Sequence, residues 1–170
     1  MILELIRASE ELEEQYNDFI FEWEAYGEDI IPYAVRLLDK DYKSWLDYTY
    51  SIENKETCPG HLVPAHTYFL VCNNKRIFGA INIRHCLNEY LFQFGGHIGY
   101  GIRPSERGKG YASLMLGMAL PIAKKLGIDE VLVTCDKNNT ASAKTIIKNG
   151  GILENEVMEE EEIVQRYWIR

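Results

Sequence analysis

The turn Arg103–Ala112 constrains the fold of this chain more than any other segment, because it joins a short predicted strand to a long predicted helix. Residues 97–102 predict the strand, and apolar residues recurring between 115 and 123 predict the helix. Gly108 and Gly110 lack a Cβ, so an anion can approach the unpaired amides at the start of that helix. The stretch predicts an anion-binding turn, and a plain glycine turn with solvated basic residues stays open as the alternative.

The first third of the chain is predicted to be mainly helical. Residues 2–6 predict a short strand, Ser9 is expected to cap the helix that follows, and residues 54–66 predict a loop. Aromatic residues are dense between positions 16 and 50. We expect them to pack in or around the core, with the lining of a pocket as the alternative.

From residue 67 onward the predicted elements are shorter. Strands are expected at 67–72, 76–83, 131–135, 152–158 and 163–169, with a helix at 141–148. The order predicts a mixed α/β fold with a predominantly antiparallel central sheet and helices on both faces.

Individual residues add local expectations. Asn73 and Asn74 predict a hairpin turn, and Pro121 predicts a bend in the long helix without ending it. Gly99 and Gly101 predict either a β-bulge or the close approach of another backbone or a ligand.

Length and composition exclude several classes of protein. A chain of 170 residues favours one domain, and no apolar run approaches the roughly 20 residues that span a bilayer, so no membrane association is expected and the default location is the cytoplasm. The net charge of -8 argues against nucleic-acid binding. The four cysteines lack the spacing of a metal site, so no metal is expected.

The glycine turn differs from two well-known phosphate-binding motifs. A P-loop requires a hydroxyl residue directly after its lysine, whereas Gly110 follows Lys109. A dinucleotide fingerprint requires a third glycine where Ser113 stands. The P-loop fails, and a nucleotide-binding oxidoreductase remains a weaker alternative.

The turn resembles the signature of the GCN5-related N-acetyltransferases (GNAT). Residues 107–112 fit the pattern Q/R-x-x-G-x-G/A, with a matching strand before them and an Asn-rich strand-to-helix loop at 138–142. The resemblance is specific over residues 68–151 and implies the acyl-CoA N-acyltransferase fold. It also implies a single domain with acceptor-side helices in 1–66, an acetyl-CoA-binding core in 67–151 and a C-terminal hairpin in 152–170, and it leaves a homodimer open.

The same resemblance implies acetyl-CoA as the co-substrate and an amine as the acceptor. The pyrophosphate would bind the amides of the turn, and the pantetheine would pair with the strand before it, in a gap where two central strands splay apart. The residues implied in cofactor binding are Gly101, Ile102, Arg107, Gly108, Lys109, Gly110, Tyr111, Ala112, Asn138 and Ser142.

Direct transfer to an amine needs a base, a group that polarises the thioester carbonyl and a proton source for the sulfur. The N–H near Ile102 is expected to polarise the carbonyl. Many family members supply the proton from a tyrosine whose place here is taken by Ile146. The candidates for the proton source are Tyr111, Tyr100, Ser142 or water. The candidates for the base are His97, Glu89, His85 or bulk water.

We therefore predict an acetyl-CoA-dependent N-acetyltransferase that works through a ternary complex. The acceptor is either a small cationic amine, which acidic and aromatic residues could surround, or a peptide amine. A non-catalytic acyl-CoA-binding module is the main alternative, because the usual tyrosine is missing.

Overall fold

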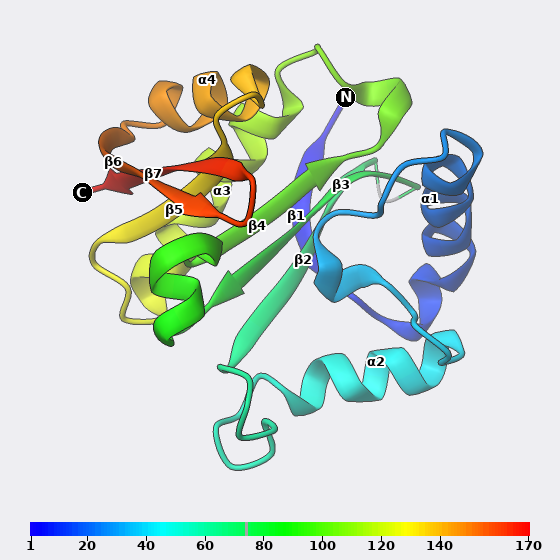
Figure 1. The fold of residues 1–170 in the computed structure, drawn as a ribbon. Helices are drawn as coiled ribbons and strands as arrows, with labels where there is room; N and C mark the ends of the chain where they lie inside the picture. Colours follow the sequence, from blue (N-terminus) through cyan, green and yellow to red (C-terminus); the bar gives the residue numbers. More distant parts are fainter. Residues whose placement is uncertain (74) are drawn as a thin grey trace.

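The protein is described here by a computed structural model covering residues 1–73 and 75–170, so Asn74 of the predicted turn lies outside the described residues. Within these residues seven strands form two antiparallel sheets (Figure 1). The first has the order β1-β2-β3-β4, with bounds Leu3–Arg7, Ala65–Cys72, Arg76–Arg84 and Ile98–Ile102. The second has the order β5-β7-β6, with bounds Val131–Asp136, Glu162–Ile169 and Ile152–Glu159.

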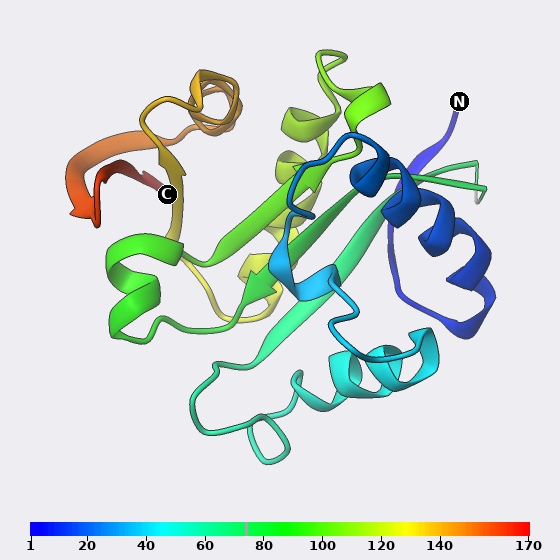
Figure 2. The same cartoon turned by 45° about the vertical axis from the view of Figure 1, so that its right-hand side comes forward.

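Helices cover both faces of the first sheet, and the predicted mixed α/β class is confirmed. Figures 1 and 2 show α1 and α2 on one side of this sheet, with α3 behind it and α4 beside the second sheet. The bounds of these four helices, in chain order, are Glu13–Ala25, Tyr42–Ser51, Tyr111–Lys125 and Thr140–Lys148.

Successive apolar side chains of β2 point to opposite faces of the sheet and contribute to a separate core on each face. Phe69 and Val71 pack with α1 and α2, whereas Leu70 between them packs with α3. This is the period-2 pattern of a strand buried on both sides. Half of the aromatic residues between positions 16 and 50 belong to the α1 and α2 core, and these buried residues are Tyr16, Phe19, Trp23, Tyr42 and Trp45.

The expectation that α3 continues past Pro121 is confirmed, and the expected side-chain cap at Ser9 is wrong. Helix α3 continues through Pro121 and ends before Gly127, which has the positive φ of a helix-terminating glycine. Ser9 precedes a short helical turn, but its side chain makes no capping hydrogen bond. Strand β4 pairs with β3 in continuous register, so no bulge occurs at Gly99 or Gly101.

The alternative reading of the two glycines is the correct one. A Cβ on Gly101 would collide with the carbonyl oxygen of Ile31, and a Cβ on Gly99 would lie against Pro32 and Arg84. The loop after α1 therefore rests directly on β4. The glycines allow this close approach of two backbones.

Candidate active site

The two sheets diverge between β4 and β5, which leaves a gap in the middle of the molecule. His97, just before β4, donates its backbone N–H to the carbonyl of Leu132 in β5 at 2.7 Å. Beyond this point the strands belong to separate sheets. The expected splaying of two central strands is therefore present.

Pairing with β3 decides which backbone groups of β4 face the gap. Arg84 donates to the carbonyl of His97, and Arg103 donates to the carbonyl of Phe78. In an antiparallel pair, residues that face the partner strand alternate with residues that face away, so the carbonyl of His97, the backbone groups of residues 99 and 101 and the N–H of Arg103 face β3. Those of Tyr100 and Ile102 face away from β3, toward the gap. Gly101, which the sequence placed among the pantetheine-binding backbone groups, has its own amide and carbonyl turned to β3.

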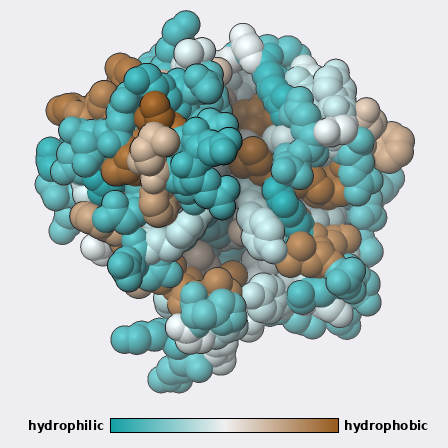
Figure 3. All heavy atoms as spheres, viewed as in Figure 1, coloured by the Kyte–Doolittle hydropathy of each residue, from teal (hydrophilic) through white to brown (hydrophobic). Residues whose placement is uncertain are grey.

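A cleft of about 710 Å³ opens along this gap. Figure 3 shows the surface hollowed between the part built by α4 and β5–β7 and the part built by α1, with apolar residues in the hollow. The cleft is lined by β4, the turn before α3, the first residues of α3, one face of α4, and the side chains of Trp23, Glu28 and Ile31. Trp23 is one of the aromatic residues for which pocket lining was the alternative, whereas Glu28 and Ile31 were not identified from the sequence, because nothing local marks them as neighbours of β4.

The glycine turn lies at the mouth of the cleft and directly precedes α3. Gly108 and Gly110 have φ values of +74° and +85°, and a Cβ at either position would meet no protein atom within 4 Å. Gly110 is the N-cap residue of α3 and provides no side chain to bond the first amides of the helix. These amides and the positive end of the helix dipole make the turn suitable for a phosphate group.

Arg107 spans the cleft beside the turn. Its Nε donates to the carbonyl of Ile102, which faces the gap, at 3.0 Å. Its terminal nitrogens pair with Glu28, and its guanidinium lies 4.8 Å from the ring centroid of Trp23. The hydrogen bond from Arg107 lowers the pKa of Glu28 below its usual range. This side chain therefore connects β4 to the loop after α1.

One face of α4 forms the opposite wall. Ser142, Thr145 and Lys148 follow each other at intervals of three residues and line the cleft together with Lys144. Thr145 and Lys148 were missed from the sequence, although their spacing from Ser142 places all three on one helix face. Ile146 is fully buried in the core, so its position does not face the cleft.

A pair of hydroxyl groups joins the two walls. The Tyr100 hydroxyl lies 2.8 Å from the Oγ of Ser142. Burial raises the pKa of Tyr100 to about 12, although its hydrogen bond with Ser142 acts in the opposite direction. Tyr100 therefore holds its proton at neutral pH, inside the cleft.

His97 is buried at the closed end of the gap, and its geometry argues against the expected role as general base. Its Nδ1 accepts the backbone N–H of Leu132 at 2.9 Å, so the ring completes the link between β4 and β5. Burial and the nearby charge of Arg84 lower its pKa to about 4. The imidazole acts here as a structural acceptor, outside the set of cleft-lining residues.

The remaining predicted residues divide between the cleft and its surroundings. Tyr111 lines the cleft, but its hydroxyl lies 3.7 Å from the Met1 sulfur. Glu89 is exposed on the segment before a π-helical turn, Leu91–Gly95, and lies away from the cleft. Lys109 is not among the residues that line the cleft, and its side chain pairs with Glu106 at 2.9 Å. Asn138 is also outside the lining.

The neighbouring amide, Asn139, lines the cleft instead, and its Oδ1 caps α4 by accepting the N–H of Ser142. Of the predicted cofactor residues, the structure brings together Gly101, Ile102, Arg107, Gly108, Gly110, Tyr111, Ala112 and Ser142.

No group of three or more His, Cys, Asp or Glu side chains suited to a metal ion occurs among residues 1–73 and 75–170. Within the same described part of the chain, no helix is long and apolar enough to cross a membrane.

Comparison with known proteins identifies relatives of this architecture. A family model described as an acetyltransferase (GNAT) domain matches residues 7–152. A search of curated proteins finds no match.

Several solved structures share the fold. RimL, a ribosomal L7/L12 alpha-N-protein acetyltransferase in complex with coenzyme A, matches with a TM-score of 0.69 and 19% identity over 98% of this chain and 92% of that one. An acetyl transferase from Salmonella typhimurium that modifies the N-terminal serine of L7/L12 matches with a TM-score of 0.67 and 18% identity, over 98% and 93% of the two chains. A mutant of the spermidine N-acetyltransferase SpeG from Vibrio cholerae matches with a TM-score of 0.61 and 17% identity, over 99% and 94%.

Proposed function

Because the chain belongs to the GNAT acetyltransferase family, we propose that it transfers an acetyl group from acetyl-CoA to a primary amine by direct attack in a ternary complex. The observation that carries this proposal is the continuity of the cleft. An anion-binding turn at the start of α3 leads directly into a gap where backbone groups of β4 have no strand partner.

The cleft offers matched surfaces to the two ends of coenzyme A. The amides of residues 108–112 would hold the pyrophosphate, and Lys144 and Lys148 on α4 would add positive charge. The backbone groups of Tyr100 and Ile102 that face the gap would pair with the pantetheine amides, in the way that a strand pairs when it is added to the edge of a sheet. Arg107 would then release the Ile102 carbonyl, which its Nε occupies here.

When bound, acetyl-CoA supplies an acetyl group activated as a thioester. The N–H of Ile102 would polarise its carbonyl, as an oxyanion-hole donor does. The Tyr100 hydroxyl, which keeps its proton at neutral pH, would protonate the departing sulfur, and Ser142 would orient that hydroxyl. Tyr100 thus takes the place of the tyrosine that other family members have on the helix after the Asn-rich loop.

The proton of the attacking ammonium would leave to water. His97 is committed to Leu132, Glu89 is exposed away from the cleft, and His85 lies outside the cleft lining with its Nε2 2.6 Å from the Nδ1 of His66. We therefore assign no side chain as base. For the acceptor, small cationic amines and peptide N-termini are the two classes to test, since proteins of similar fold are named for spermidine and for a ribosomal protein N-terminus.

The proposal is tested in two steps. Calorimetric titration with acetyl-CoA, with NADP as the comparison ligand, should give micromolar binding of acetyl-CoA alone. Binding of NADP instead would support the oxidoreductase alternative and overturn the proposal. Release of free CoA thiol is then measured with a panel containing spermidine, smaller diamines and peptides with free N-termini. Tight binding without transfer to any amine would favour the acyl-CoA-binding module.

A further inference from the structure

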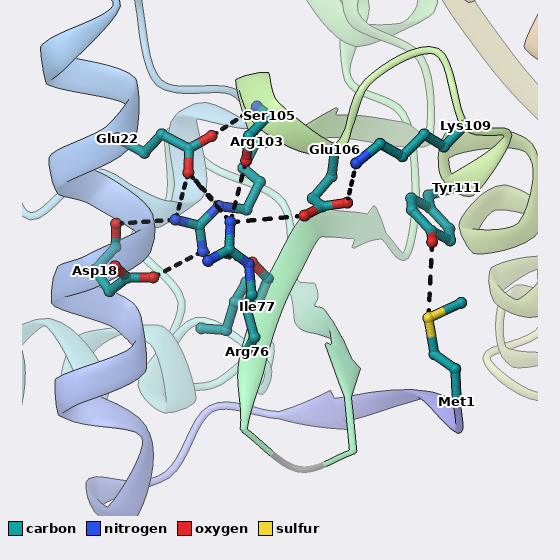
Figure 4. A network of polar contacts seen from close by, with 10 residues as sticks. All are labelled: Met1, Asp18, Glu22, Arg76, Ile77, Arg103, Ser105, Glu106, Lys109 and Tyr111. Atoms are coloured by element: carbon teal, nitrogen blue, oxygen red, sulfur yellow. Dashed lines mark hydrogen bonds and ion pairs between the residues drawn. The ribbon is translucent and has the colours of Figure 1, made fainter.

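An ion cluster built around the buried guanidinium of Arg103 links α1 to the turn that precedes α3. The Arg103 side chain is 2% exposed, and its guanidinium reaches two acidic residues of α1. Its Nε donates to Glu22 at 2.7 Å and its Nη1 to Asp18 at 2.8 Å, and Nη1 also donates to the carbonyl of Ile77 at 3.1 Å. Figure 4 shows both carboxylates pointing from α1 toward this guanidinium.

Glu22 differs from Asp18 because it also holds the backbone of the turn. Its Oε1 accepts the N–H of Ser105 at 2.7 Å, within the short helical turn Pro104–Glu106. Ser105 stands three residues before Gly108. One carboxylate therefore fixes both the side chain at the end of β4 and the first amide of the segment that leads to the glycines.

The cluster continues outward from this point (Figure 4). Arg76 of β3 lies 3.5 Å from Glu22 and 3.6 Å from Glu106, and it donates to the Ser105 hydroxyl at 3.1 Å. Lys109 in turn pairs with Glu106 at 2.9 Å. The polar contacts thus follow the turn from the end of β4 to the residue between its two glycines.

The charge state of Glu22 suits a fixed support. Burial acts to raise its pKa, but hydrogen bonds from Arg103 and Ser105 outweigh burial and lower the pKa to about 2. Glu22 is therefore ionised at every pH where the protein would work. It is not among the residues that line the cleft, so it would act on a ligand only through the turn.

We propose that Glu22 is a positioning residue for phosphate recognition: from α1 it holds Ser105 and Arg103, and thereby sets the direction of the amides at Gly108 and Gly110. This inference rests on the proposed function, since it concerns the pyrophosphate of acetyl-CoA. Fixed amides bind an anion better than mobile ones, because no ordering has to occur on binding. The cluster would also make cofactor affinity depend on the position of α1.

The experiment compares three variants of the full chain: Glu22→Ala, Asp18→Asn and Glu14→Gln. The first removes both the charge and the acceptor for Ser105. The second perturbs the other acidic partner of Arg103 without touching Ser105, and the third changes an exposed carboxylate of the same helix. Affinity for acetyl-CoA by calorimetry and the midpoint of thermal unfolding are measured on the same samples.

We expect Glu22→Ala to weaken acetyl-CoA binding by about tenfold or more. Asp18→Asn should lower the unfolding midpoint but keep the affinity within about twofold, and Glu14→Gln should change neither. If Glu22→Ala and Asp18→Asn lower the midpoint alike and both keep the wild-type affinity, the cluster is only a structural support and the inference is overturned.

A second variant covers the case in which Glu22→Ala does not fold. Glu22→Gln keeps the shape and an oxygen for Ser105 but loses the charge, so we expect it to bind acetyl-CoA more weakly than wild type, by less than about tenfold. Wild-type affinity in Glu22→Gln with a lowered unfolding midpoint would overturn the role of its charge. Failure of the wild-type protein to bind acetyl-CoA is a different outcome, which rejects the proposed function itself.

Discussion

Substitutions at two glycines with the same φ can distinguish an effect on ligand binding from an effect of backbone strain. Gly110 at the start of α3 and Gly127 just after it both have φ of +85°, and a Cβ at either would meet no protein atom within 4 Å. Gly110 lines the cleft and Gly127 does not. Substitution by alanine therefore imposes the same strain at both sites, but only one of them adjoins the proposed phosphate site.

The expected magnitudes follow from this geometry. A left-handed φ costs an L-residue about 1–2 kcal/mol, so both Gly110→Ala and Gly127→Ala should lower the unfolding midpoint by about 2–8 °C. At Gly110 the added methyl group would also displace a phosphate from the amides. The loss of one charge-assisted hydrogen bond, about 1.5–3 kcal/mol, corresponds to about 10- to 100-fold weaker binding of acetyl-CoA.

The assay is calorimetric titration of wild type, Gly110→Ala and Gly127→Ala with acetyl-CoA, with differential scanning fluorimetry on the same preparations. Equal losses of stability with a loss of affinity confined to Gly110→Ala would support the placement of the pyrophosphate. Equal affinities for the two variants would refute it, because the turn would then be a structural one. Gly110→Leu extends the series and should abolish binding without unfolding the domain.

Two further predictions concern proton transfer and acid stability. Tyr100→Phe should lower kcat for acetyl transfer while acetyl-CoA affinity changes by less than about threefold, and an unchanged kcat would remove Tyr100 as the proton source. Glu22 has its pKa lowered from 4.5 to about 2 in the folded protein, so it stabilises the fold above about pH 4.5, and this contribution is lost as the pH falls from there toward 2. The difference in unfolding free energy between wild type and Glu22→Gln, from urea titrations at pH 7, 4 and 3, should therefore shrink with acid, and a pH-independent difference would contradict the assignment.

The glycine turn could be predicted because its signals are local. A strand, two glycines and an apolar helix lie within about thirty consecutive residues, and each acts through its own backbone preferences. The gap before it was implied by family resemblance and not by the residues themselves. Which backbone groups face that gap depends on pairing with β3. The resemblance implied Gly101 and Ile102, whereas the register turns the backbone groups of Ile102 and Tyr100 to the gap and those of Gly101 to β3.

Contacts between residues far apart in the sequence explain the other differences between the sequence-based predictions and the structure. Arg103 and Glu22 are 81 residues apart, and no pattern around either residue indicates the other. Ile31 approaches Gly101 because of the path of the loop after α1, which has no periodic signal. His97 illustrates a different difficulty. An imidazole on the cofactor strand suits a base and a structural acceptor equally, and only the position of Leu132 distinguishes them.

Under the proposed function, the proton source that the family places on α4 would come from the opposite wall of the cleft. Successive helix residues are rotated by about 100°, so Ile146 turns toward the core while Thr145 and Ser142 face the gap. The position of Ile146, where many family members have a tyrosine, therefore suggested that the general acid was absent. The proposed reaction requires a protonated hydroxyl near the departing sulfur. Tyr100 of β4, whose hydroxyl lies 2.8 Å from the Oγ of Ser142 in α4, would supply it. If this substitution is functional, Ser142→Ala should reduce kcat less than Tyr100→Phe, because Ser142 only orients the group that gives up its proton.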